Sequence, residues 1–187
     1  MVILNALAMK CDDVMEPQRK KQSPNREAAV FPNPRDAQQS RPGGRPIVLV
    51  IEDSEDDFYL LHRAFKKLEG LTEMRHLRDG TEAIHYLAEA KQNWQDAPAL
   101  LLLDLKMPGT SGFEVLKWVR DDPVFKLLPV NVLSSSAESA DVQKAFELGA
   151  NAYTVKPMSL QEYDDLVATL LKFWLDLGKL PRPNPYS

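Results

Sequence analysis

The sequence predicts an α/β fold, a doubly wound sheet of five parallel strands with five helices. From residue 47 onward, short apolar runs alternate with longer segments whose apolar residues recur at helical spacing. The short runs are almost continuously apolar, which is typical of parallel strands covered on both faces. The segments between them are long enough for a right-handed helical crossover. Together these observations indicate one sheet between two layers of helices.

The expected elements follow in chain order. We expect strands at residues 47–51, 74–77, 100–103, 130–133 and 152–155. Apolar residues at helical spacing predict the first four helices around residues 58–68, 84–88, 113–119 and 142–146. A fifth helix over residues 160–174 closes the series. Large apolar residues continue on more than one side of its wheel, as far as Leu177, so we expect a second surface to cover it.

The domain organisation follows from composition. Residues 1–45 are rich in proline and polar residues without periodicity, so we expect a disordered leader, either a flexible extension or a docking segment. The folded domain is expected at residues 46–179 and a proline-rich tail at residues 180–187. One cysteine, Cys11, excludes an internal disulfide, and no apolar stretch is long enough to span a membrane. These features favour a cytoplasmic protein.

The charge of the chain is unevenly distributed. Residues 1–46 carry eight Lys or Arg against five Asp or Glu, a net charge of +3, which leaves −7 on residues 47–187. An acidic surface repels nucleic acid phosphates. We therefore exclude nucleic acid as a partner of the folded part.

Ionisable residues follow the expected strands at the same end. Glu52 and Asp53 follow the first strand, Asp104 the third, Ser134 the fourth and Lys156 the fifth. In a doubly wound sheet, ligands bind beyond the carboxyl ends of the strands. Carboxylates gathered there repel one another, and a hard divalent cation such as Mg²⁺ relieves that repulsion. The pattern predicts a magnesium site suited to phosphoryl transfer.

Asp104 is the expected nucleophile. A carboxylate that follows a buried apolar strand loses water contacts, and this is unfavourable unless the carboxylate has a partner. Attack on a phosphoryl group would give an acyl phosphate, whose oxygens Mg²⁺, Lys156 and Ser134 could neutralise or hydrogen-bond. No histidine is placed as a hydrolytic base, so we expect only slow self-dephosphorylation and no enzymatic turnover. A phosphohydrolase would need an acid two residues after Asp104, where the chain has Lys106.

Plainer readings exist for several of these residues. Asp53, followed by an acidic run, could simply begin a helix. Lys156 on its own could be a solvated loop residue. Ser135 and Ser136 are interpreted as a simple polar turn. Tyr153 could be ordinary sheet packing with its hydroxyl at the wet end.

Four motifs, in order and at matching spacing, resemble the receiver domain of two-component response regulators. They cover about 130 residues, and the resemblance implies a flavodoxin-like fold. The motifs are Val48-Leu-Val-Ile-Glu-Asp53, Leu101-Leu-Leu-Asp-Leu-Lys-Met-Pro-Gly109, Pro129-Val-Asn-Val-Leu-Ser134 and Gly149-Ala-Asn-Ala-Tyr-Thr-Val-Lys-Pro157. The acidic run after Glu52 is also similar to small regulators associated with bacterial phytochromes.

The resemblance implies a role for each matching residue. Asp104 matches the phosphoacceptor, and Lys156 matches the phosphate-binding lysine, with a cis bond before Pro157. For Mg²⁺, it implies direct ligation by Asp53, Asp104 and the backbone carbonyl of Lys106, with Glu52 acting through water. Ser134 and Tyr153 match the two switch positions.

The resemblance also implies partners. It predicts a single-domain response regulator of a bacterial two-component phosphorelay, phosphorylated by a histidine kinase, phytochrome-type or hybrid, or by a phosphotransfer protein. Output would be a protein contact, and a homodimer through the fourth helix, fifth strand and fifth helix is our hypothesis. The alternative is a pseudo-receiver that is never phosphorylated and binds its partner constitutively.

Overall fold

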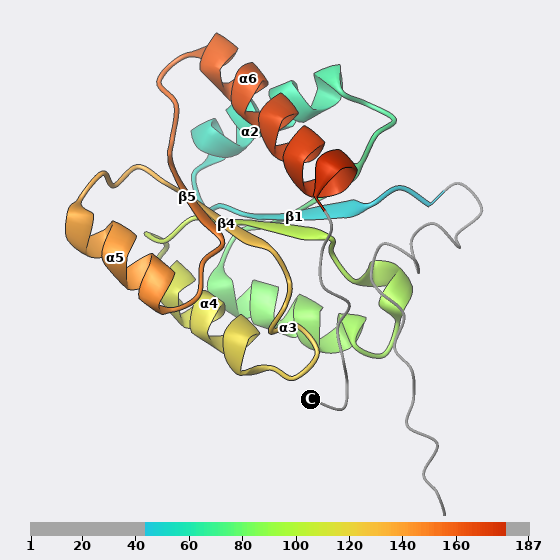
Figure 1. The fold of residues 1–187 in the computed structure, drawn as a ribbon, viewed down its shortest axis with the longest axis vertical. Coiled ribbons are helices and arrows are strands. Elements are labelled where there is room, and N and C mark those ends of the chain that lie inside the picture. Colours follow the sequence, from blue (N-terminus) through green and yellow to red (C-terminus); the bar gives the residue numbers. More distant parts are fainter. Residues whose placement is uncertain (1–43, 179–187) are drawn as a thin grey trace, which may run out of the picture.

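The computed structural model describes residues 44–178. They form a five-stranded sheet, which lies between two layers of helices (Figure 1). All four strand pairings are parallel, in the order β2-β1-β3-β4-β5. The strands are β1 (Ile47–Ile51), β2 (Glu73–Leu77), β3 (Leu100–Leu103), β4 (Val130–Ser134) and β5 (Ala152–Val155). The predicted fold class is confirmed. Two strand ends differ slightly, because β2 begins one residue earlier and β4 ends one residue later than expected.

Five α-helices cover the two faces of the sheet. They are α2 (Glu55–Lys67), α3 (Gly80–Ala90), α4 (Gly112–Asp121), α5 (Ser139–Glu147) and α6 (Leu160–Leu171). Helices α2 and α6 lie on one face, whereas α3, α4 and α5 lie on the other (Figure 1). A short 3₁₀ turn, Trp94–Asp96, precedes β3. No helix within residues 44–178 is long and apolar enough to cross a membrane.

The core consists of two clusters, one on each face of the sheet. Alternate residues of the central strands divide between them: Leu49 and Leu101 pack toward α3 and α4, whereas Val48 and Leu102 pack toward α2 and α6. Strands β1, β3 and β4 are buried along their whole length, while β2 and β5 at the edges are partly exposed. This alternation fixes the register of each strand, because a slip of one residue would exchange the two faces.

The end of the last helix differs from the prediction. The α-helix ends at Leu171 and continues as a π-helix over Lys172–Leu177, where an α-helix was expected to run to Trp174. The wider turn places Trp174 and Leu175 against the same apolar cluster as α6. Phe173 and Leu177 remain exposed, so part of the apolar surface expected on this helix faces solvent.

Glycine is required where α4 meets the strand-end loops. A Cβ built on Gly112 would lie 2.0 Å from the backbone oxygen of Asp104. The Gly112 amide also donates to the carbonyl of Leu105 at 3.2 Å. This close approach holds the start of α4 directly against Asp104, the residue that follows β3.

Candidate functional site

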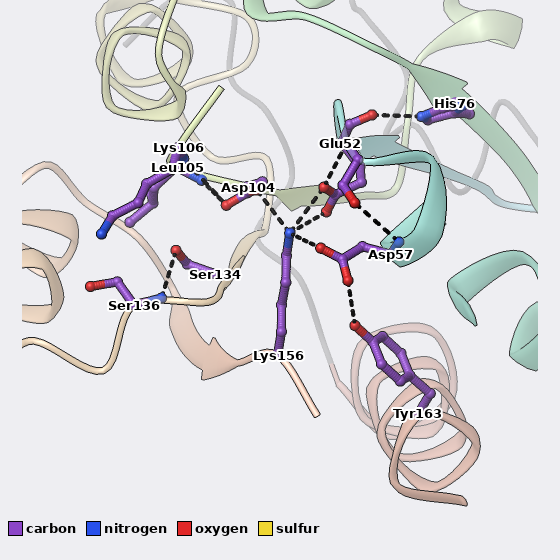
Figure 2. A network of polar contacts seen from close by, with 11 residues as sticks. Glu52, Asp57, His76, Asp104, Leu105, Lys106, Ser134, Ser136, Lys156 and Tyr163 are labelled. Atoms are coloured by element: carbon purple, nitrogen blue, oxygen red, sulfur yellow. Dashed lines mark hydrogen bonds and ion pairs between the residues drawn. The ribbon is translucent and has the colours of Figure 1, made fainter. Parts of the chain in front are cut away.

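Four charged side chains meet at the carboxyl ends of the strands, as predicted. Glu52 and Asp53 follow β1, Asp104 follows β3 and Lys156 follows β5. These strands belong to one parallel sheet, so the residues that follow them lie at the same edge of it. We call this edge the rim. Figure 2 shows Glu52 and Asp104 directed at the ammonium group of Lys156. The sequence therefore located the rim correctly from the strand pattern.

The Asp104 carboxylate is buried and held from two sides. The residue is 5% exposed, and its amide donates to the Ile51 carbonyl at 3.0 Å. One carboxylate oxygen, Oδ1, accepts hydrogen bonds from the amides of Leu105 (2.6 Å) and Lys106 (3.3 Å). The other, Oδ2, lies 2.8 Å from Lys156 Nζ. These contacts fix the plane of the carboxylate and place one positive charge beside it, while leaving lone pairs of its oxygens open to a further partner.

Lys156 is the hub of the site. Its Nζ lies 2.7 Å from Glu52 Oε2, 2.8 Å from Asp57 Oδ2 and 2.8 Å from Asp104 Oδ2. Burial by itself lowers the pKa of this amine, but hydrogen bonds to Asp104, Asp57 and Glu52 outweigh it and raise the pKa well above its usual range. The lysine is therefore a fixed ammonium ion at any physiological pH.

Glu52 is the most deeply buried acid of the rim, at 2% exposure. Burial raises the pKa of its carboxyl to about 7, although Lys156 acts in the opposite direction. The nearby lysine thus does not offset the cost of burying this carboxylate. A site in this condition favours either a proton or an additional cation.

Three carboxyl groups are placed to receive such a cation. Oxygen atoms of Glu52, Asp53 and Asp104 all lie within 4.8 Å of one another. Glu52 and Asp104 are buried, whereas Asp53 is exposed and open to solvent. An all-oxygen set with one open side suits a hard divalent ion that keeps part of its water shell. The residues present therefore fit Mg²⁺ or Mn²⁺.

Ser134 and Tyr153 meet at the loop that follows β4. The buried Ser134 hydroxyl accepts a hydrogen bond from the Ser136 amide at 3.3 Å. The Tyr153 hydroxyl donates to the Ser136 carbonyl at 2.9 Å. Within residues 44–178 neither hydroxyl is hydrogen-bonded to Asp104. Both predicted switch residues therefore bind the same loop.

Two expectations for these loops are wrong. Ser136 is not a simple polar turn residue, because it is 6% exposed and its hydroxyl donates to Asp141 Oδ2 in α5 at 2.6 Å. The bond before Pro157 is trans, since the described residues contain no cis peptide bond. The trans form is the lower-energy state of an ordinary X-Pro bond, by about 0.5–1 kcal/mol.

Two residues of the site were missed from the sequence. Asp57 contacts Lys156, and the Tyr163 hydroxyl donates to Asp57 Oδ1 at 3.4 Å (Figure 2). Asp57 looked like one more acid in the first turn of a helix, and Tyr163 like a core residue of α6. The signal that could have found Asp57 is its position in the first turn of the helix that leaves the rim, five residues after Glu52.

Comparison with known proteins identifies the family of this fold. A model of the response regulator receiver domain matches residues 48–168. Response regulator Rcp1 of Synechocystis is 34% identical over 136 residues, which cover 72% of this chain and 92% of Rcp1. FilR2 of Methanothrix harundinacea, named a probable methanogenesis regulatory protein, is 31% identical over 137 residues, covering 73% of this chain and 88% of FilR2.

Solved structures give the same result. The phosphorylated cyanobacterial phytochrome response regulator RcpA is 33% identical, with a TM-score of 0.66 over 73% of this chain and 99% of RcpA. The Mn²⁺-bound form of Rcp1 is also 33% identical, with a TM-score of 0.64 over 73% of this chain and 99% of Rcp1. These relatives share the fold across the whole region that carries the rim.

Proposed function

This chain belongs to the response regulator receiver domain family, and from that premise we propose that it is a single-domain response regulator phosphorylated on Asp104 in a Mg²⁺-dependent reaction. The observation that carries the proposal is the contact between Lys156 Nζ and Asp104 Oδ2, 2.8 Å apart at a largely buried rim. A fixed ammonium beside a buried carboxylate is the arrangement that a developing phosphoryl charge requires.

The chemistry follows from the atoms of the site. An Asp104 carboxylate oxygen attacks the phosphorus of the donor, and the bond from phosphorus to the leaving group breaks. That leaving group, the imidazole of a phosphohistidine or the acetate of acetyl phosphate, departs with the bonding electron pair. The amides of Leu105 and Lys106 orient the carboxylate, and Lys156 pairs with a phosphoryl oxygen. Bound Mg²⁺ would neutralise phosphoryl charge beside Glu52, Asp53, Asp104 and the Lys106 carbonyl.

Ser134 and Tyr153 are proposed to transmit the change. A phosphoryl group on Asp104 would offer a new acceptor for the Ser134 hydroxyl, which now accepts from the Ser136 amide. Movement of that hydroxyl would release the loop that Tyr153 holds through the Ser136 carbonyl. The position of α5 depends on the same loop, because Ser136 also bonds Asp141. Phosphorylation would therefore shift an existing equilibrium at α5 and β5.

We propose that the aspartyl phosphate persists and that the protein has no enzymatic turnover of its own. Slow loss of the phosphoryl group requires that no base activates water beside Asp104. His76 lies near the rim, but its Nε2 is 2.8 Å from the Glu52 carbonyl and its ring stacks on Phe58. These contacts direct the imidazole away from the phosphoacceptor.

The proposed partners are a donor and a target. The donor would be a histidine kinase or a phosphotransfer protein in the cytoplasm, and likeness to RcpA supports a phytochrome-type kinase. The target would bind the face formed by α5, β5 and α6, which exposes Phe146 and Val155. A homodimer through this face is also proposed. Sedimentation of a monomer at high concentration, both phosphorylated and unphosphorylated, would rule the dimer out.

The test is phosphorylation of the purified protein with acetyl phosphate and Mg²⁺, followed by intact-mass analysis. We expect one added phosphoryl group in the wild type. No group should be added when EDTA removes Mg²⁺, or in the Asp104→Asn variant. Asp53→Asn should retain the fold and require much more Mg²⁺. If neither acetyl phosphate nor histidine kinases modify the folded wild type, the protein acts instead as a constitutive interaction module.

A further inference from the structure

Asp57 occupies a helix position that is normally used for capping, but its carboxylate is turned elsewhere. It is the third residue of α2, after the N-cap Ser54. The glutamates at this position of α3, α4 and α6 each accept a hydrogen bond from a backbone amide just before their own helix: Glu82 from Arg78, Glu114 from Ser111 and Glu162 from Ser159. In α2 the Ser54 amide is bound instead by Glu52 Oε1 at 3.2 Å. The Asp57 carboxylate is therefore not used to cap its own helix.

The Asp57 carboxylate is fixed between two helices. Its Oδ2 lies 2.8 Å from Lys156 Nζ, and its Oδ1 accepts from the hydroxyl of Tyr163 in α6 at 3.4 Å (Figure 2). Tyr163 is 1% exposed and belongs to the apolar cluster beneath α2 and α6. Burial, and then the charge of Asp57, raise the pKa of this phenol to about 12, so it remains a donor.

The three acids around Lys156 are not equivalent. Glu52 and Asp104 belong to the set of carboxylates that can share a cation, whereas Asp57 does not. When that set is engaged by a cation, and Asp104 also by a phosphoryl group, Asp57 remains available to the ammonium. Without such an anchor, the long side chain of Lys156 would regain its rotamer freedom at the step in which the ammonium group must stay in place.

We propose that Asp57, oriented by Tyr163, is the positioning residue that holds Lys156 over Asp104 during phosphoryl transfer. The inference rests on the proposed function of Asp104 and adds a residue to it. Asp57 does not touch the phosphoryl group, and acts only through the lysine. It also connects the start of α2 and the side of α6 to the reacting atoms.

The test is a set of rates measured with acetyl phosphate across a range of Mg²⁺ concentrations. For Asp57→Ala we expect the rate at saturating Mg²⁺ to fall by roughly 10- to 100-fold, the cost of a misplaced charged group, with half-saturation by Mg²⁺ changed less than about twofold. Asp57→Asn keeps an oxygen acceptor for the lysine and should recover much of the rate. Asp56→Asn removes the same charge one residue away on the exposed surface and should match the wild type.

Two further arms separate the alternatives. In a Lys156→Ala background, Asp57→Ala should cause no additional loss, since its only route of action is gone. Independent effects in that background, or a higher Mg²⁺ requirement at an unchanged maximal rate, would overturn the proposal. The latter would place Asp57 in the water shell of the cation.

A third arm does not depend on phosphorylation. In ¹⁵N-labelled protein with Mg²⁺, the ammonium resonance of Lys156 should be sharp in the wild type and in Asp56→Asn, and broadened in Asp57→Ala. A sharp resonance in Asp57→Ala would overturn the positioning role. Absence of an adduct in the wild type, with both acetyl phosphate and histidine kinases, would instead refute the proposed function, so the two failures are distinguishable.

Discussion

Helices α5 and α6 follow neighbouring strands from the same rim, but they are attached to the molecule very differently. Helix α6 has a capping box made by Ser159 and Glu162, and it buries four side chains, those of Tyr163, Val167, Leu170 and Leu171. Helix α5 has no side-chain cap at Glu138 and buries only Ala145. A helix with few buried groups opens and shifts at low cost. The molecule thus places a firmly held helix and a loosely held one on either side of β5.

The contrast extends to the polar contacts with the rim. Helix α6 reaches Lys156 through Tyr163 and Asp57, while α5 reaches the Ser134 loop through Asp141 and Ser136. The first route fixes the position of a charge that the proposed phosphoryl transfer needs. The second passes through the loop that the proposed switch would release. Under the proposed function, the firmly attached helix α6 would position Lys156, and the loosely attached helix α5 would respond to phosphorylation.

The largest effect is expected from truncating one side chain in each of the two helices. Leu171→Ala in α6 removes a side chain that is 4% exposed and should lower the free energy of unfolding by about 2–5 kcal/mol. Phe146→Ala in α5 removes one that is 51% exposed and should change it by less than about 0.5 kcal/mol. Urea denaturation measures both. Equal losses would show that α5 is as firmly packed as α6.

A second test uses pH, on the rim that α6 helps to shape. Because burial raises the folded-state pKa of Glu52 from 4.5 to about 7, the folded protein binds a proton that the unfolded chain has released. Without divalent cations, this group's contribution to stability should fall by on the order of 1–3 kcal/mol as pH rises from about 4.5 through 7. Glu52→Gln should remove that dependence in urea titrations between pH 5.5 and 8. An unchanged pH profile in the variant would assign the effect to other groups.

Capping gives a third, smaller comparison. Ser159→Ala removes the hydroxyl that caps α6 and should cost about 0.5–2 kcal/mol of unfolding free energy. At the corresponding position of α5, Glu138→Ser introduces a cap where there is none and should add up to about 1 kcal/mol. Thermal unfolding should give a lower Tm than the wild type for Ser159→Ala and a higher one for Glu138→Ser. A loss in both would mean that Glu138 supports α5 by contacts other than a cap.

The smallest expected effect concerns the ion pairs between α2 and α6. Asp164 lies 3.2 Å from Arg63 Nη1 and 2.5 Å from Lys67 Nζ, and these cations hold the pKa of its carboxyl below the usual value. Asp164→Asn should destabilise the protein slightly, and the difference from wild type should shrink in 1 M NaCl, where the Debye length is about 3 Å. A difference that is independent of salt would point to packing instead of charge.

The fold was predictable because its pattern is local. Short apolar runs separated by helix-length segments specify parallel strands, and strand ends then specify the rim, so Asp53, Asp104 and Lys156 were placed correctly. The continuation of α6 as a π-helix was not predictable, because it depends on how Trp174 and Leu175 meet a surface built by distant residues.

Asp57 and Ser136 were misjudged for a related reason. An acid in a first helical turn and a serine in a run of serines each have a plain local explanation, which the sequence alone cannot reject. The contacts that distinguish these two residues join positions far apart in the sequence. Asp57 meets a lysine 99 residues away, and the carbonyl of Ser136 is held by a tyrosine 17 residues away. Local pattern identifies the elements, but the polar contacts between them follow only from the assembled fold.

The close approach at Gly112 has a consequence for how genetic variation in this protein would be interpreted. Any side chain there would collide with the main chain of Asp104, so alanine, the mildest replacement, should already displace this proposed phosphoacceptor. A mutational survey scored by signalling output would rank Gly112 beside Asp104 and Lys156, although glycine contributes no functional group. Sensitivity at that position would report the space that the proposed chemistry needs, not a residue that takes part in it.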